Sequence, residues 1–171
     1  NEIDVLQKLA ERREALDADS RADLRVALGW PIPGAEVLRT PALDGTWQVL
    51  GAHRDLVGDY QQQRTWYLAP DGAVDVAFES GGRGQALGVP QLAGAVVTGR
   101  GHRYPGHPPR RLLFDGTPSP SATAPTWPGG SIAAARSAAS DALGVSPWRD
   151  VFPVLLTGVT FDAGRVVDAD G

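Results

Sequence analysis

The residues best suited to chemistry gather between Gly99 and Phe114, in the stretch GRGHRYPGHPPRRLLF. This stretch contains four arginines, three prolines and two of the three histidines of the chain. Imidazole nitrogens could ligate a metal ion, and guanidinium groups could bind phosphate or carboxylate. The prolines fit a third role, a stiff turn between two strands. Metal site, nucleic-acid patch and structural turn are therefore the three hypotheses for this stretch.

The metal hypothesis uses His102 and His107, with an acidic residue from elsewhere, such as Asp55 beside His53. Two histidines five positions apart in a proline-rich turn do not share a helical face, so their spacing does not direct both rings toward one ion. The chain has no cysteine, which excludes disulfides, thiolate catalysis and sulfur-based zinc sites. We expect no cofactor and no metal, and keep His102 and His107 as the candidates if one is bound.

The nucleic-acid hypothesis assigns phosphate contacts to the arginines and base stacking to the tyrosine. The candidate binding residues are Arg100, Arg103, Tyr104, Arg110 and Arg111. The net charge of −4 argues against non-specific binding by the whole surface but permits a local patch. Alternation along a strand would divide these arginines between two faces, so about two would share a surface.

Motifs of three enzyme classes are incomplete. Lys8 is the only lysine and no P-loop surrounds it. The glycine-rich run that begins at Gly82, GRGQALG, is one residue too long for a dinucleotide fingerprint and follows a hairpin rather than opening a βαβ unit. Ser131, after two glycines, nearly forms a nucleophile elbow, but the proline-rich residues before it cannot form a central strand and no histidine follows it. An N-cap role explains Ser131, and we predict no enzymatic activity.

The N-terminal segment, residues 1–40, is predicted to be helical. Residues 2–16 carry one apolar stripe among charged residues, which is typical of a helix with one buried face. A second helix would begin at Ser20, with Asp23 completing a capping box, and end at Gly29 before a Trp-Pro pair. A short helical turn would follow at 35–39.

From residue 41 the pattern changes to alternation, which indicates strands. The predicted strands are 46–51, 64–69, 73–78, 93–99 and 109–114, followed by a final hairpin at 153–161 and 165–169. Residues 115–130, rich in proline and serine, are predicted to be a flexible loop, and 131–143 an inserted helix. The chain is thus predicted to be α+β: N-terminal helices (1–40) packed on an antiparallel, partly barrel-like β body (41–171).

The tryptophans are predicted to anchor the core. Trp47, Trp66 and Trp148 each lie in an apolar strand or strand entry, a context typical of buried aromatics. Trp66 and Leu68 share one face of their strand, and the apolar residues of 74–78 share one face of the next. We expect both faces to pack into the same core.

No run approaches the roughly 18 apolar residues of a membrane helix. The charged N-terminal stretch does not resemble a signal peptide. We therefore expect a cytoplasmic protein without a membrane partner. The chain lacks methionine even at position 1 and stops abruptly, so we expect it to be a piece of a longer polypeptide.

An ordered set of short motifs resembles the C-terminal region of bacterial SWIM zinc-finger family proteins. The motifs are WQVLG at 47–51, RTWYL at 64–68, VAF at 76–78, YPG at 104–106 followed by Pro109 and Arg111, and PWRDVFPVLLTGV at 147–159. The stretch ADLRVALGWPIPGAEVL at 22–38 resembles the helix that precedes this region. The similarity covers most of the chain from Ala22 onward.

The resemblance implies that the YPG turn is structural, because its proline, its glycine and Arg111 belong to the shared pattern. His102, Arg103, His107 and Arg110 do not match that pattern. The zinc module of the family needs cysteines, so it would lie outside this chain. The resemblance further implies partners such as an AAA+ ATPase or a von Willebrand A-type protein. We therefore expect a non-catalytic, protein-binding module of a larger bacterial protein, with nucleic-acid binding by the turn at 100–111 as the alternative.

Overall fold

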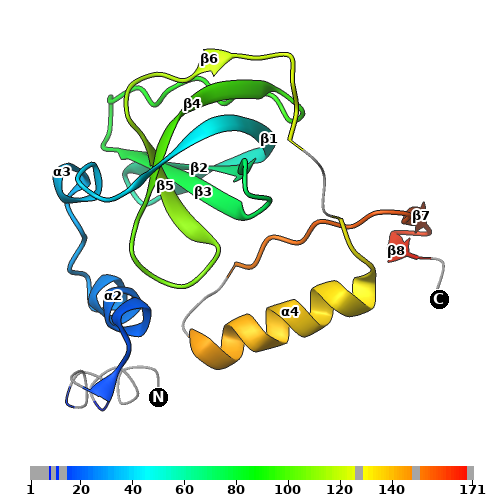
Figure 1. Cartoon of the computed structure of the whole chain (residues 1–171), viewed down its shortest axis with the longest axis horizontal. Coiled ribbons are helices and arrows are strands. Elements are labelled where there is room, and N and C mark those ends of the chain that lie inside the picture. Colours follow the sequence, from blue (N-terminus) through cyan, green and yellow to red (C-terminus); the bar gives the residue numbers. More distant parts are fainter. Residues whose placement is uncertain (1–7, 9–10, 12–14, 126–128, 148–150, 169–171) are drawn as a thin grey trace.

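The computed structural model describes Lys8, Glu11 and residues 15–125, 129–147 and 151–168. Three helices and eight strands lie within these residues (Figure 1). The helices are α2 (Ala18–Ala27), α3 (Gly34–Val37) and α4 (Ile132–Val145). The strands are β1 (Ala42–Val57), β2 (Tyr60–Leu68), β3 (Val74–Gly81), β4 (Val96–Arg103), β5 (Arg110–Phe114), β6 (Ser119–Pro120), β7 (Thr160–Asp162) and β8 (Arg165–Val167). The helix predicted at 2–16 falls mostly outside the described residues, as does Trp148.

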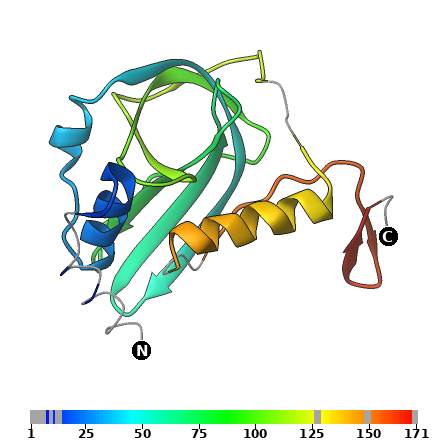
Figure 2. The ribbon, with the colours of Figure 1, turned by 60° about the horizontal axis from the view of Figure 1, so that its bottom comes forward.

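Five strands form a partly closed barrel, because β1 is long enough to pair at both ends of the sheet. Its first half, Ala42–Gln48, pairs with β4 and its second half, Gln48–Val57, pairs with β2. The order is β1-β2-β3-β5-β4, and the β1–β4 ladder completes the ring (Figure 2). The prediction of an α+β fold with a barrel-like body is confirmed.

One expectation about the sheet was wrong, since it is mixed rather than antiparallel throughout. β3 pairs with β5 in parallel over three residue pairs, from Asp75↔Arg110 to Ala77↔Leu112. β4 lies between β1 and β5 in the ring, so β5 pairs with β4 on one side and with β3 on the other. In this position β5 runs in the same direction as β3, and the two strands pair in parallel. The last residues of β3, Phe78–Gly81, extend beyond the final pair, and this leaves the barrel only partly closed.

Trp47 is at the centre of the barrel, as predicted. Its side chain is fully buried and meets the ring of Phe114 edge-on, with centroids 5.4 Å apart. Around it the inward-facing positions of the strands alternate with outward-facing ones. The buried residues of this core are Trp47, Val49, Tyr67, Ala69, Val97 and Leu112.

Trp66 is not part of this core, contrary to expectation. It pairs with Val76, so the predicted faces of β2 and β3 do lie on one surface, but that surface is the outside of the barrel. The inward position on β2 belongs to its neighbour Tyr67. Trp66 instead borders an apolar groove between the barrel and residues 151–156. Alternation predicted which residues share a face, and the closure of the barrel decided which face became the inside.

The N-terminal helices cover one end of the barrel with a second small core. Its buried residues are Ala22, Ile32, Val37 and Tyr104, with Leu113 packed against them. Helix α2 begins earlier than predicted, because its N-cap is Asp17, whose carboxylate accepts from Ser20 N at 2.9 Å. It ends as predicted, where Gly29 adopts a φ of +82°.

Helix α4 follows Ser131, which caps it by accepting from Ala134 N at 3.2 Å. It ends two residues later than predicted, at Val145, and none of its residues is buried. In the predicted loop 115–130, Ser119 and Pro120 form β6 beside β4. Residues 151–159 lead to the β7–β8 hairpin (Figure 1). Across the described ranges, no helix combines the length and apolar character needed to cross a membrane.

Candidate functional site

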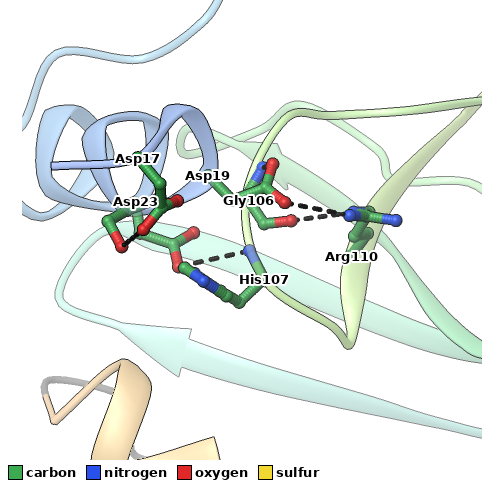
Figure 3. A network of polar contacts seen from close by, with 7 residues as sticks. Asp17, Asp19, Asp23, Gly106, His107 and Arg110 are labelled. Carbon is green, nitrogen blue, oxygen red and sulfur yellow. Dashed lines mark hydrogen bonds and ion pairs between the residues drawn. The ribbon is translucent and has the colours of Figure 1, made fainter.

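The proline-rich turn between β4 and β5 docks helix α2 onto the barrel (Figure 3). Gly106 N donates to Asp19 Oδ1 at 3.2 Å, and Arg110 Nη2 donates to Asp19 Oδ2 at 3.2 Å. Asp23 receives His107 N at 3.3 Å, and His107 Nδ1 lies 2.9 Å from Asp23 Oδ2. Two successive turns of α2 thus provide the carboxylates that face the turn.

The turn approaches α2 too closely for any side chain at Gly106. A Cβ built there would lie 2.3 Å from Asp23 Oδ1, and the φ of Gly106 is +132°. Arg110 Nε also donates to the Gly106 carbonyl at 2.7 Å, which fixes the same loop from the barrel side. Glycine is therefore required for both the backbone conformation and the close packing.

Arg103 is held within the protein by two aspartates. Its Nη1 and Nη2 atoms donate to the two oxygens of Asp71 at 2.6 and 2.8 Å, and its Nε donates to Asp75 Oδ2 at 2.8 Å. The hydrogen bonds from Arg103 lower the pKa of Asp71, whereas burial raises the pKa of Asp75. With three N–H groups engaged, the guanidinium of Arg103 serves to join β4 to the β2–β3 turn.

The two metal candidates are held by different parts of the chain. His102 is buried, and its Nδ1 lies 3.0 Å from the Thr40 carbonyl oxygen, whereas His107 faces Asp23 on α2. Their neighbours differ because His102 lies on the face of β4 opposite to Gly101 and packs against the segment that precedes β1, whereas the turn carries His107 to the helix. Within the described part of the chain, no group of three histidine, aspartate or glutamate residues is placed to hold a metal ion.

The remaining candidates lie in two different settings. Arg100 is exposed on β4, with Nε 3.8 Å from Asp44 Oδ1 on β1. Arg111 is exposed on β5, where its guanidinium carbon lies 4.6 Å from the Tyr104 ring centroid and 5.1 Å from that of Phe78. Tyr104 itself is buried beneath it. The structure thus brings Tyr104 and Arg111 together and places Arg100 elsewhere.

Several contributors to this region carry no sequence signal of their own. Phe78 receives a second cation, because the Arg64 guanidinium carbon lies 5.4 Å from its ring centroid. Asp71 and Asp75, the partners of Arg103, belong to a turn and a strand that precede it by about 30 residues. Only the Pro-Asp-Gly turn signal marks Asp71, and it indicates a turn rather than an ion pair.

A different surface lies at the far end of the β1–β2 hairpin. Leu56, Val57 and Tyr60 are 72%, 54% and 61% exposed. The loop after β3 borders them: a Cβ at Gly82 would lie 3.9 Å from the Tyr60 ring, and the Gly88 carbonyl accepts from Arg54 Nη2 of β1 at 2.6 Å. We call Leu56, Val57 and Tyr60 the hairpin-end surface.

No protein-family model, curated protein or solved structure matches this chain.

Proposed function

We propose that this chain is a non-catalytic, protein-binding module of a larger bacterial protein. The observation that carries the proposal is the hairpin-end surface, where two aliphatic side chains and a tyrosine stand in solvent at the end of a paired β-ribbon. Val57 and Tyr60 pair across the ribbon and share one of its faces, and Leu56 is exposed on the other. Exposed apolar patches mark interaction sites, and tyrosine is enriched at the energetic centres of interfaces. A paired hairpin also presents them with little conformational entropy left to lose on binding.

The neighbouring loop extends this apolar area. Val89 follows Gly88, whose carbonyl is held by Arg54, and its side chain is 90% exposed. Asp59 and Arg83 flank the area as an exposed pair, with Arg83 Nε 3.8 Å from Asp59 Oδ1. An apolar centre with charged residues at its margin is the usual arrangement of a protein interface.

The resemblance to SWIM zinc-finger family proteins supplies the partners to test, namely the AAA+ ATPase and the von Willebrand A-type protein that accompany such proteins. The experiment is isothermal titration calorimetry of this chain with each of them. Leu56→Ser combined with Tyr60→Ser should weaken binding by at least about tenfold, since a few residues carry most of the energy of an interface. Phe161→Ser, at an 83% exposed position on β7, is the matched control and should leave the affinity unchanged.

Two results would contradict this proposal. Absence of binding to both proteins would remove the partner assignment. Binding that survives the double substitution, or that is lost equally with Phe161→Ser, would show that the hairpin-end surface is not the interface.

Nucleic-acid binding is the second candidate, and it is favoured by one observation. Arg64 and Arg111 both contact the ring of Phe78 on the outer surface of β2, β3 and β5, a combination of cations and aromatics suited to single strands. The carboxylates around Arg103 and Arg110 offset much of the remaining positive charge of the turn. Arg64 Nη1 also lies 3.5 Å from Asp55 Oδ2, so the expected contribution to phosphate binding is concentrated at Arg111.

Fluorescence anisotropy with short single- and double-stranded DNA and RNA tests this candidate. Binding should be strongest at low salt and fall steeply as salt rises, because phosphate contacts release counterions. Arg111→Ala should weaken it and Arg100→Ala should not. Absence of binding at low salt would exclude the nucleic-acid function.

A further inference from the structure

A cavity of about 460 Å³ lies between α2, β3 and the turn that joins β4 to β5. Its walls are mostly apolar and include Val26, Ile32, Val76, Pro105 and Pro109. Its volume falls within the range of about 300–1,000 Å³ that is typical of small-molecule sites. The docking of α2 onto the turn forms one side of it, so the contacts in Figure 3 hold this cavity open.

Most of the charged groups around the cavity are already balanced. Asp23 faces His107, and Arg110 is bonded to Asp19 on α2 and to the Gly106 carbonyl. Arg111 differs: within the described residues no carboxylate lies within ion-pair distance of its guanidinium. Among the described residues that line this mostly apolar space, Arg111 is therefore the cation without a carboxylate partner.

The surroundings of Arg111 also fix its orientation. Aromatic rings attract a guanidinium through its flat face, and the rings of Tyr104 and Phe78 lie 4.6 and 5.1 Å from its central carbon. Such stacking leaves the N–H edges available for hydrogen bonds. With the described residues Arg111 makes one hydrogen bond, from Nη2 to the Phe78 carbonyl at the long distance of 3.4 Å.

We propose that this cavity binds a small molecule with a planar apolar body and a single carboxylate or phosphate group. The apolar body would lie against Val26, Ile32 and Val76, and the anion would accept hydrogen bonds from the free N–H edge of Arg111. Bonds between a guanidinium and an oxyanion are short and strong, and they are strengthened where an apolar wall excludes water. The site is independent of the hairpin-end surface, because the two share no residue.

The first probe is 8-anilinonaphthalene-1-sulfonate, an aromatic anion whose fluorescence rises in apolar surroundings. The whole 171-residue chain should bind it saturably at one site. Arg111→Gln should weaken binding by about tenfold, the effect of losing a charge-assisted hydrogen bond. Arg100→Gln is the matched control, since it makes the same change on the exposed surface of β4, and it should leave the affinity unchanged.

Two competitors distinguish the sources of the anion. Displacement by indole-3-acetate with no effect of adenosine monophosphate would assign the site to aromatic carboxylates, and the reverse would assign it to nucleotides. Failure of both to displace the probe would overturn the proposal.

A measurement on the unsubstituted protein covers the case in which Arg111→Gln does not fold. Methyl ¹H–¹³C spectra should show probe-induced shifts at Val26, Ile32 and Val76, without comparable shifts at Leu56 and Val57. Shifts centred on the hairpin end would overturn the cavity assignment, as would non-saturable binding or an equal loss in the Arg100→Gln control.

Discussion

Arg103 on β4 donates from Nε to Oδ2 of Asp75 on β3 at 2.8 Å, and the carboxylate that it meets is almost fully buried. Because the same guanidinium also holds both oxygens of Asp71, this arginine ties the β2–β3 turn to the middle of the barrel. Arg103, which belongs to the basic stretch of the sequence, therefore forms ion pairs within the protein and stabilises the fold. Removing a cation from beside a buried carboxylate is expected to cause a large loss of stability.

Arg103→Gln should lower the free energy of unfolding by about 3 kcal/mol at neutral pH, because it leaves Asp75 buried without its counter-charge. Urea denaturation monitored by tryptophan fluorescence measures this loss. Asp75→Asn added to Arg103→Gln should recover part of it, since a neutral amide costs less to bury than a lone carboxylate. A loss below about 1 kcal/mol would mean that the pair behaves as a surface ion pair.

The deficit of Arg103→Gln should also depend on pH. Burial raises the pKa of Asp75 above its value in the unfolded chain, so folding favours the protonated form. The associated stability is present below the unfolded pKa and is lost as pH rises through the folded pKa. Asp71 has the opposite sign: Arg103 lowers its pKa, and that stabilisation is lost as pH falls. The difference between the wild type and Arg103→Gln should therefore be largest near pH 7 and shrink toward pH 4. A constant difference would contradict this linkage.

The pair formed by Asp19 and Arg110 should behave differently, although it belongs to the same turn. Its side chains are 39% and 33% exposed, so solvent screens their attraction. A double-mutant cycle with Asp19→Asn and Arg110→Gln should give a coupling of less than about 1 kcal/mol. A coupling that approaches the Arg103–Asp75 value would show that the α2–turn contact is much less hydrated than its exposure indicates.

Local patterns in the sequence predicted the main strands of the barrel, the Ser131 cap and the burial of Trp47, because alternation, capping and aromatic burial act over a few residues. The strand predicted at 153–161 was wrong over most of its length, since β7 begins only at Thr160. The closing ladders of the barrel could not be predicted in this way. The β1–β4 pairing runs from Ala42↔His102 to Gln48↔Val96, which joins residues about 50 to 60 positions apart. The parallel β3–β5 pairing depends on β5 pairing with β4 on one side and with β3 on the other. Trp66 shows the consequence. It shares a face with the residues predicted to be beside it, but that face was expected to point into the barrel and it points outward.

The candidate site shows the same limit. The sequence shows that arginines are concentrated in this stretch. Whether an arginine can bind an anionic ligand depends on whether the fold places carboxylates beside its guanidinium group. Arg103 meets Asp71 and Asp75 from a different hairpin, whereas Arg111, its close neighbour in the sequence, meets two aromatic rings. To predict that Arg103 is paired with carboxylates and Arg111 is not, one must know the register of β3 against β5. No local motif in the sequence encodes that register.

Gly101 should be the least replaceable glycine of the barrel interior. A Cβ at this position would lie 2.6 Å from Trp47 Cζ2 and 2.8 Å from Leu112 Cδ1, both in the buried core. Gly101→Ala should therefore lower the free energy of unfolding by about 1–3 kcal/mol, the cost of overpacking a core. Gly51→Ala on β1 is the control, since no atom lies within 4 Å of the Cβ position, and thermal unfolding should show little change there. Equal melting temperatures for the two variants would mean that the core relaxes around the added methyl group.

The cap of α2 provides a direct test of the local electrostatics. Hydrogen bonds from the Ser20 hydroxyl and then from its backbone N–H lower the pKa of Asp17 from 3.8 to about 2. The stability that this cap adds is present above pH 3.8 and is lost as pH falls toward 2. In an NMR titration of the carboxyl carbon, Ser20→Ala should raise the Asp17 pKa toward its ordinary value, because the stronger of the two bonds is removed. Ser131→Ala is the control: it removes the N-cap hydroxyl of α4, which accepts from Ala134 N, and it should leave the Asp17 pKa unchanged. A wild-type Asp17 that titrates near 3.8 would show that the carboxylate does not cap the helix in solution.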